Sequence, residues 1–150
     1  MFTDIDEQVA RAVVSKLLKA LDARAAGLWK VEGDALVQVC FVPAEDLDPN
    51  VAADFEAATR DVSLARTNLG IVQAFVKRLP AVSPADDLLA DSGSGYWLRA
   101  FGAVRSIALP WFEGDHGPVR LILSVALPDS NRDADSVVAA IRAEIESFLR

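Results

Sequence analysis

The side chains best suited to nucleophilic or metal chemistry are Cys40 and His116, the single cysteine and single histidine of the 150-residue chain. A thiol that reduces an oxidised sulfur becomes a sulfenic acid, which a second thiol must resolve through a disulfide. Because no second thiol exists, we expect Cys40 to be a small buried residue on a strand. His116 lies in the turn sequence EGDHG, where an exposed side chain is expected, and a Ser-His-Asp triad would depend on it. We therefore predict no catalytic residues and no enzymatic activity.

A run of acidic and amide side chains near the C-terminus imitates the start of a calcium-binding loop. Such a loop needs Gly at its sixth position and a bidentate Glu at its twelfth, but the sequence has Ala134 and Ala140 there. A helix start explains the acidic residues better, because negative charge is favourable at that end. We therefore predict no metal site at the run Asp129, Asn131, Asp133 and Asp135.

Aromatic and polar side chains from separate parts of the chain form the candidate set for a ligand pocket. Small-molecule pockets are mostly apolar with a few orienting polar groups, and an Arg suits a flat or anionic ligand. The same aromatic residues would equally serve to fill a core, and the sequence leaves both interpretations open. The candidate set is Cys40, Arg66, Thr67, Asn68, Phe75, Tyr96, Trp97 and Ser106.

The elements that must position these residues are organised around two apolar runs, 104–112 and 119–126. Runs rich in Val, Ile and Leu that flank a short Gly-containing turn predict a β-hairpin, here buried on both faces. A second hairpin is predicted from 25–31 and 35–42, which flank the Gly33-Asp34 pair.

Side chains along 35–42 are expected to alternate between the two faces of the sheet. The apolar set Val37, Val39 and Phe41 is expected to face the main core. Gln38 and Cys40 would then project from the opposite face.

Helices are predicted at both ends of the chain, over 4–21 and 133–149. The apolar stripe of the first is widened by two residues, and the second repeats apolar residues at intervals of three and four. A stripe wider than one sheet face requires indicates contact with a second copy, so we predict a homodimer formed through these helices. The predicted interface residues are Val14, Leu18, Val138, Ile141, Ile145 and Phe148.

Shorter elements are predicted between the hairpins. They are helices over 51–61, 69–77 and 96–101, a loosely helical stretch at 86–91 and a short strand at 79–83. Strands that pair as hairpins imply a mainly antiparallel sheet, with the terminal helices on one face and the middle helices over the other. We predict a single α+β domain over residues 1–150, with a cavity beneath the middle helices.

Composition narrows the classes of partner. Net charge is −7 and 52% of residues are hydrophobic, which fits a globular domain and disfavours a nucleic-acid backbone as partner. No apolar run approaches the roughly 20 residues of a membrane helix, and the N-terminal residues lack the order of a signal peptide. A single cysteine fits a reducing compartment. We expect a cytoplasmic protein with no membrane partner.

Several stretches together resemble the GAF domain family across nearly the whole chain. They are AGLW at 26–29, NLGIV at 68–72, LPAVS at 79–83, FGAVRSIALP at 101–110 and VRLILSV at 119–125. The resemblance implies an antiparallel sheet of five or six strands, with the terminal helices behind it and a small-molecule pocket in front. It also implies frequent dimerisation through the terminal helices.

The special ligands of the GAF family are not supported by this sequence. Residues 96–101 hold neither the Cys nor the His that bilin attachment requires, and haem ligation would rest on His116. The motif of cyclic-nucleotide domains is absent, and the free methionine sulfoxide reductases need a second thiol. We therefore expect no cofactor.

Two functional hypotheses follow. The first is a sensory or regulatory GAF-like domain that binds an unknown small molecule and signals as a helix-mediated dimer to a separate protein chain. The alternative is a ligand-free dimerisation or protein-interaction module with a filled pocket. They differ in whether the pocket is open.

Overall fold

Two β-hairpins join edge to edge to form the centre of the sheet. The first consists of β1 (Ala25–Glu32) and β2 (Ala35–Pro43), and the second of β5 (Arg105–Phe112) and β6 (Val119–Leu127). The antiparallel pairing of β1 with β6 connects them. The short strands β3 (Asp61–Ser63) and β4 (Ala81–Pro84) complete a six-stranded sheet in the order β3-β2-β1-β6-β5-β4. This computed structural model describes residues 6–85, 93–114, 116–129 and 131–148.

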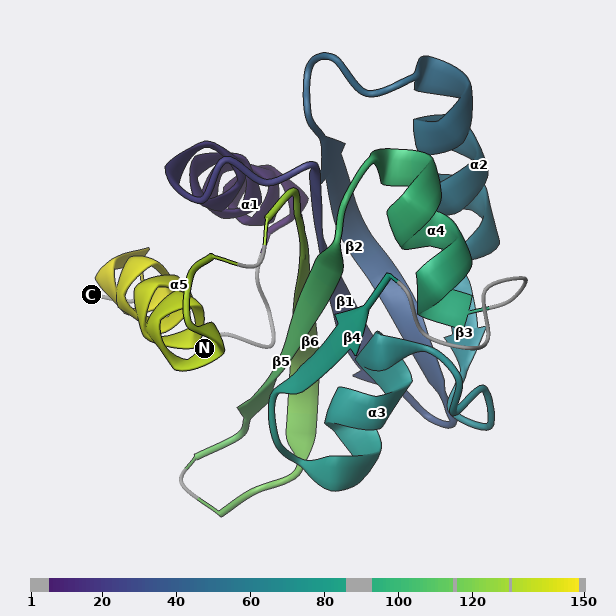
Figure 1. Ribbon diagram of the computed structural model, residues 1–150. Coiled ribbons are helices and arrows are strands. Elements are labelled where there is room, and N and C mark those ends of the chain that lie inside the picture. Colours follow the sequence, from purple (N-terminus) through teal and green to yellow (C-terminus); the bar gives the residue numbers. More distant parts are fainter. Residues whose placement is uncertain (1–5, 86–92, 115, 130, 149–150) are drawn as a thin grey trace.

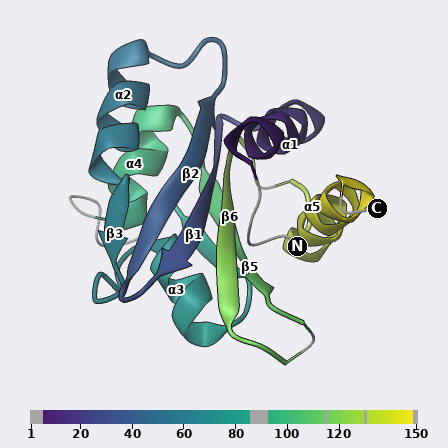
Figure 2. The ribbon, with the colours of Figure 1, turned by 180° about the vertical axis from the view of Figure 1, so that it is seen from behind.

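The five helices divide between the two faces of the sheet (Figures 1 and 2). The terminal helices α1 (Glu7–Ala20) and α5 (Ala134–Phe148) lie together behind it. The middle helices lie in front: α2 (Pro49–Ala58), α3 (Gly70–Lys77) and α4 (Gly93–Phe101). The predicted α+β architecture, with terminal helices on one face and short helices on the other, is therefore confirmed.

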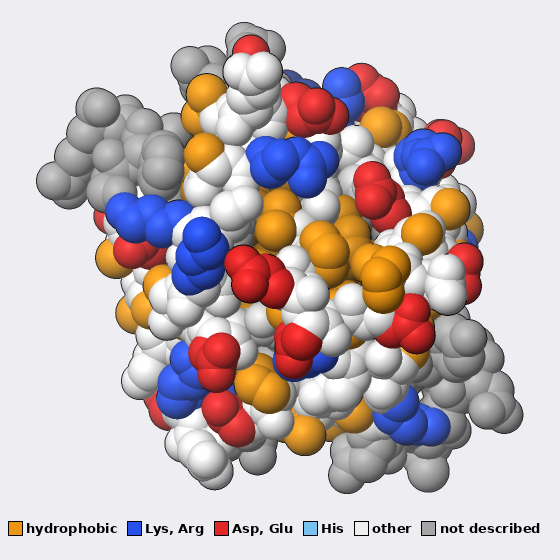
Figure 3. Space-filling view, turned by 90° about the horizontal axis from the view of Figure 1, so that it is seen from above, with side chains coloured by type: hydrophobic (Ala, Val, Ile, Leu, Met, Phe, Trp, Pro, Cys, Tyr) orange, Lys and Arg blue, Asp and Glu red, His pale blue; other side chains and the backbone are white. Residues whose placement is uncertain are grey.

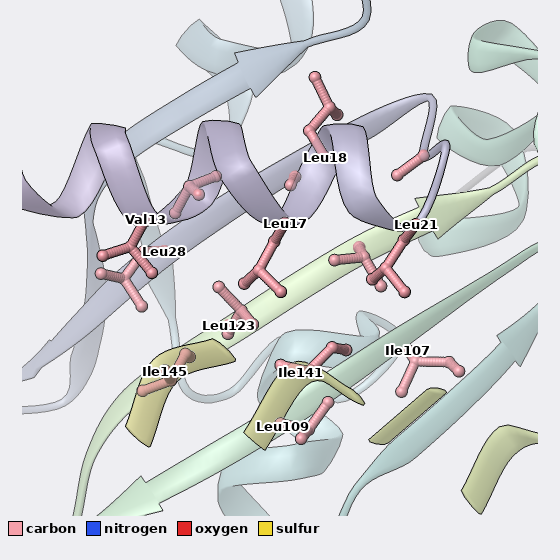
Figure 4. Packing of buried hydrophobic residues seen from close by; sticks show 14 of the residues in the cluster. Val13, Leu17, Leu18, Leu21, Leu28, Ile107, Leu109, Leu123, Ile141 and Ile145 are labelled. Atoms are coloured by element: carbon pink, nitrogen blue, oxygen red, sulfur yellow. The ribbon is translucent and has the colours of Figure 1, made fainter. Parts of the chain in front are cut away.

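A continuous apolar core fills the space between the sheet and the terminal helices (Figure 4). Leu17 of α1 and Ile141 of α5 are fully buried against strand residues such as Leu109. The wide stripe of α1 is explained by this position, because the helix contacts both the sheet and α5. Burial of this kind stabilises a fold by about 25 cal/mol per Å² of apolar surface.

The predicted dimer residues lie inside this core. Val14 and Ile141 have no exposed surface, and Leu18, Val138 and Ile145 are buried as well. These five side chains pack within one chain, because α1 and α5 share a seam with each other and with the sheet. They are therefore not available to a second copy. The Phe148 side chain lies outside the described part of the structure.

The boundaries of some elements differ from those predicted. Helix α1 begins at Glu7 rather than at residue 4, because the Asp6 carboxylate accepts a hydrogen bond from the Gln8 amide and caps it there. Strand β3 was not predicted, since its three residues are too few to show alternation. It pairs with β2 and buries Val62. The predicted stretch at 86–91 lies outside the described residues.

The surface carries both signs of charge. On the face shown from above in Figure 3, Lys and Arg side chains are interspersed with Asp and Glu around an apolar patch. No helix in the described ranges has the length and apolar character needed to cross a bilayer.

Candidate functional site

Small residues form a continuous area on the front face of the sheet, which we call the floor. They occupy two neighbouring rows that cross β4, β5, β6 and β1, and each of these four strands contributes two small residues. Large side chains at these positions would fill the space beneath the middle helices, whereas small ones leave room. The rows are Ser83, Ser106, Ala126 and Ala25, followed by Ala81, Ala108, Ser124 and Gly27.

An aromatic cluster covers the floor, with Phe55 of α2 at its centre. The Phe55 ring lies 5.1 Å from both Trp97 and Phe101 of α4, in edge-to-face geometry. It also lies 5.0 Å from the ring of Phe41 on β2 and 6.4 Å from that of Trp29 on β1. Such contacts stabilise beyond simple burial, so the cluster fixes α2 and α4 relative to the sheet.

A cavity remains between the floor and the aromatic cluster, and we call it the front cavity. The volume of this cavity is about 50 Å³, which is room for a few water molecules. Ser106 and Ser124 lie at its base, Phe55 and Trp97 cover it, and the start of α3 closes one side. None of the described residues that line it is charged.

The polar groups around the front cavity differ in their hydrogen bonding. The Thr59 hydroxyl donates to the Phe55 carbonyl at 2.8 Å, and the Thr59 carbonyl accepts from the Trp29 indole at 2.8 Å. Ser106 is only 8% exposed, and among the described residues its hydroxyl has no hydrogen-bond partner. The Ser124 hydroxyl, which also lines the cavity, has no hydrogen-bond partner among the described residues either. These two hydroxyls are therefore the polar groups available to a ligand.

Helix α4, which carries Trp97 and Phe101, is held at its C-terminal end. Gly102 adopts a φ of 74°, and the Gly102 and Ala103 amides donate to the Arg99 and Leu98 carbonyls in a Schellman arrangement. The Arg24 guanidinium donates to the Phe101 carbonyl at 2.9 Å and to the Asp46 carboxylate at 2.6 Å. The hydrogen bond from Arg24 lowers the pKa of Asp46 below its ordinary value.

Arg105 connects the strand beneath the cavity to the terminal helices. It directly precedes Ser106 but faces the opposite side of β5, where it is 8% exposed. Its guanidinium donates to the Asp129 carbonyl at 3.2 Å and to the Arg132 carbonyl at 2.6 Å. Arg132 in turn donates to the Leu21 carbonyl at the end of α1, at 2.7 Å. The two arginines thus hold the segment before α5 against the end of α1.

Two of the predicted site residues, Trp97 and Ser106, line the front cavity. Cys40 does not, because a bulge in the β1–β2 pairing shifts the register opposite Leu28 and Trp29. After the bulge Cys40 faces the α1 side and Phe41 faces the cavity side, while Gln38 still faces the front and reaches Thr59. Simple alternation missed this change of face.

Three other predicted residues, Arg66, Thr67 and Asn68, are exposed. They form a turn between β3 and α3, in which the Leu69 amide donates to the Arg66 carbonyl and Leu69 alone points inward. Phe75 packs against the cluster around α3 but does not line the cavity. The side chain of Tyr96 lies outside the described part of the structure.

Five residues that line the cavity are absent from the candidate set predicted from the sequence: Gly27, Phe41, Phe55, Phe101 and Ser124. For Gly27 and Ser124, the sequence does contain a pattern that could have predicted their position. Small residues recur at every second position of both central strands, in Ala25 and Gly27 and again in Ser124 and Ala126. That pattern on neighbouring strands indicates one sheet face with space above it.

Burial makes Cys40 a poor nucleophile. It raises the pKa of the thiol to about 11, although the nearby Arg11 acts in the opposite direction. Thiolate is the reactive form, so very little of it forms near neutral pH in the folded protein.

No protein family model and no curated protein matches this sequence. Solved structures do match. The GAF domain/HD domain protein from Geobacter sulfurreducens superposes with a TM-score of 0.66 at 14% identity, over 95% of this chain and 88% of that chain. The GAF domain of a two-component sensor histidine kinase from Bacillus halodurans gives 0.66 at 11% identity, over 92% and 86%.

An enzyme is also among the similar structures. Type II free methionine-R-sulfoxide reductase from Thermoplasma acidophilum superposes with a TM-score of 0.55 at 15% identity, over 93% of this chain and 92% of that chain. At such identities the likeness concerns the fold alone. The chain has a GAF-like fold.

Proposed function

We propose that this chain is a sensory or regulatory GAF-like domain that binds a small molecule in the front cavity. The observation that carries the proposal is the Ser106 hydroxyl, which lines a cavity beneath the aromatic cluster and has no partner among the described residues. Mostly apolar sites with a few polar groups are typical of small-molecule binding. One of the similar structures is the GAF domain of a sensor histidine kinase, which is consistent with a regulatory role.

The proposed role is non-catalytic. Cys40 is buried on the face of the sheet opposite the cavity, and its raised pKa keeps the thiol protonated. The signal would therefore leave the domain as a change of shape or stability, read by a separate chain or by a second copy.

A thermal-shift screen tests the proposal. The parent and a Ser124→Leu variant are screened against small neutral amides and alcohols, organic acids, amino acids and nucleotides. The proposal predicts a compound that raises the Tm of the parent by several degrees, because a ligand that binds only the folded state stabilises it. The same compound should have little effect on Ser124→Leu, whose side chain fills the cavity. A complete panel without a stabilising compound would contradict the proposal.

The packing around Phe55 supports a second candidate, a ligand-free interaction module. Four aromatic rings surround Phe55 at 5.0–6.4 Å, and the cavity that remains beneath them has a volume of only about 50 Å³. This candidate predicts self-association through an exposed surface, since the residues Val14 and Ile141 are buried. Val9 of α1 is 47% exposed, so light scattering of Val9→Asp against the parent tests it. If light scattering shows that the parent protein is a monomer, the self-association that this candidate predicts is contradicted.

A further inference from the structure

The side chains that line the front cavity offer no partner for a charged group of a ligand. Every described residue that lines it has a neutral side chain. Two arginines on the strands and loops around the cavity are engaged elsewhere: Arg24 donates to the Phe101 carbonyl and to Asp46, and Arg105 faces the other side of β5. A buried charge without a partner is strongly unfavourable. A ligand enclosed here would therefore be uncharged.

Two hydroxyl groups of the floor, those of Ser106 and Ser124, line the cavity. Ser106 pairs with Ala126, and Ser124 lies two residues before Ala126 on the same strand. The two serines are thus diagonal neighbours, roughly 7–8 Å apart. A hydroxyl both donates and accepts hydrogen bonds, so this wall suits a molecule with an amide-like or alcohol-like edge. The opposite wall consists of the rings of Phe55 and Trp97, which suits a flat apolar face.

The size of the cavity limits the ligand. Its volume of about 50 Å³ is smaller than the roughly 150 Å³ of an engineered cavity that binds benzene. A molecule as large as one ring would therefore require a side chain to move. Trp29 is only 1% exposed and donates to the Thr59 carbonyl, whereas Trp97 is half-buried at the surface of α4. Trp97 is the ring that a ligand would displace.

We propose that the ligand is a small, flat and uncharged molecule, no larger than about one substituted six-membered ring, whose polar edge hydrogen-bonds Ser106. This inference rests on the proposed function and specifies the chemical class that the front cavity accepts.

One feature of the cavity favours a negatively charged ligand instead. Gly70 and Ile71 at the start of α3 line the cavity, and helix N-termini attract anions. The experiment must therefore compare neutral and charged molecules of one shape.

Benzamide, benzoate and benzamidinium provide that comparison, because they share a ring and a planar substituent but differ in charge. Each is titrated into the parent and followed by Tm and by tryptophan emission, with Trp97→Phe to assign the emission change. We expect benzamide alone to bind. We also expect Ser106→Ala to weaken benzamide binding about five- to tenfold, the loss of one hydrogen bond. Ser83→Ala is the matched control, since Ser83 is equally buried beside Ser106 but belongs to the β4 end of the floor, which does not line the cavity.

The outcomes separate this inference from the proposed function. Binding of benzoate or benzamidinium as tight as that of benzamide would overturn the neutral class while the cavity remains a ligand site. Equal losses in Ser106→Ala and Ser83→Ala would overturn the role of Ser106. If none of the three binds but another class in the broader panel does, the inference fails and the proposed function stands. A panel with no binder at all would remove both.

Discussion

The indole of Trp29 lies over Gly27, two residues earlier on β1, so closely that a Cβ atom at Gly27 would be 2.6 Å from its Cη2 atom. The ring is held in this position because its Nε1 donates to the Thr59 carbonyl. The absence of a side chain at Gly27 is therefore what lets Trp29 form a wall of the front cavity.

Replacing Gly27 tests this relationship. We expect Gly27→Ala to lower the free energy of unfolding by about 1–3 kcal/mol, because an extra methyl group in a packed region forces neighbours to shift. Urea denaturation measures the loss. In a Trp29→Phe background the same substitution should cost less, and an equal cost in both backgrounds would show that the two residues are not coupled.

Arg105 is expected to stabilise the attachment of α5. In Arg105→Met the carbonyls of Asp129 and Arg132 lose a charged donor, so we expect a loss of about 2–4 kcal/mol in unfolding free energy. Arg142→Met, at an exposed position of α5, is the matched control and should change stability by less than about 0.5 kcal/mol. Similar losses in the two variants would contradict the role assigned to Arg105.

Arg24 and Asp46 are predicted to differ in importance although they form one ion pair. Arg24→Met removes the donor to the Phe101 carbonyl, so faster amide hydrogen exchange is expected at the C-terminal end of α4. Asp46→Ala removes only a surface partner, which contributes little, and should leave exchange in α4 nearly unchanged. Hydrogen exchange followed by mass spectrometry distinguishes the two. Equal acceleration in both variants would mean that the carboxylate, rather than the carbonyl contact, secures Arg24.

Cys40 gives a pH dependence whose direction follows from its burial. The thiol has a pKa of about 11 in the folded protein against an ordinary value of 9.0. Above pH 9.0, the ordinary pKa, the unfolded chain has lost the thiol proton while the folded chain still binds it. The contribution of this thiol to the free energy of unfolding is therefore complete below pH 9.0 and is lost as the pH rises towards about 11. The free energy of unfolding should fall less steeply over this range in Cys40→Ala than in the parent. Identical slopes would show that the thiol is not buried as described.

Much of the fold was predictable because long strands and helices leave periodic patterns. The hairpins around Gly33 and Gly114 and the stripes of α1 and α5 were all visible in this way. The site was harder to predict, because its residues are brought together by tertiary packing. A bulge beside Cys40 reverses the face that alternation assigns, and the turn before α3 points Arg66 outward. Neither feature has a clear signature in a single sequence.

The predicted dimer stripe shows a second limit. A wide apolar stripe on α1 indicates two packing partners, but the pattern does not say which two. In this structure the partners of Leu17 and Leu18 are the sheet and α5 of the same chain. Dimerisation therefore remains a prediction, to be tested on exposed positions such as Val9.

The central claim is that the space between the small-residue floor and the aromatic cluster binds a small molecule. The most direct measurement is a crystal structure of the protein soaked with the strongest stabilising compound of the panel. We predict ligand density between Ser106 and Phe55, with Trp97 displaced. Density at another surface, with Phe55 and Trp97 in the same edge-to-face contact as here, would contradict the claim.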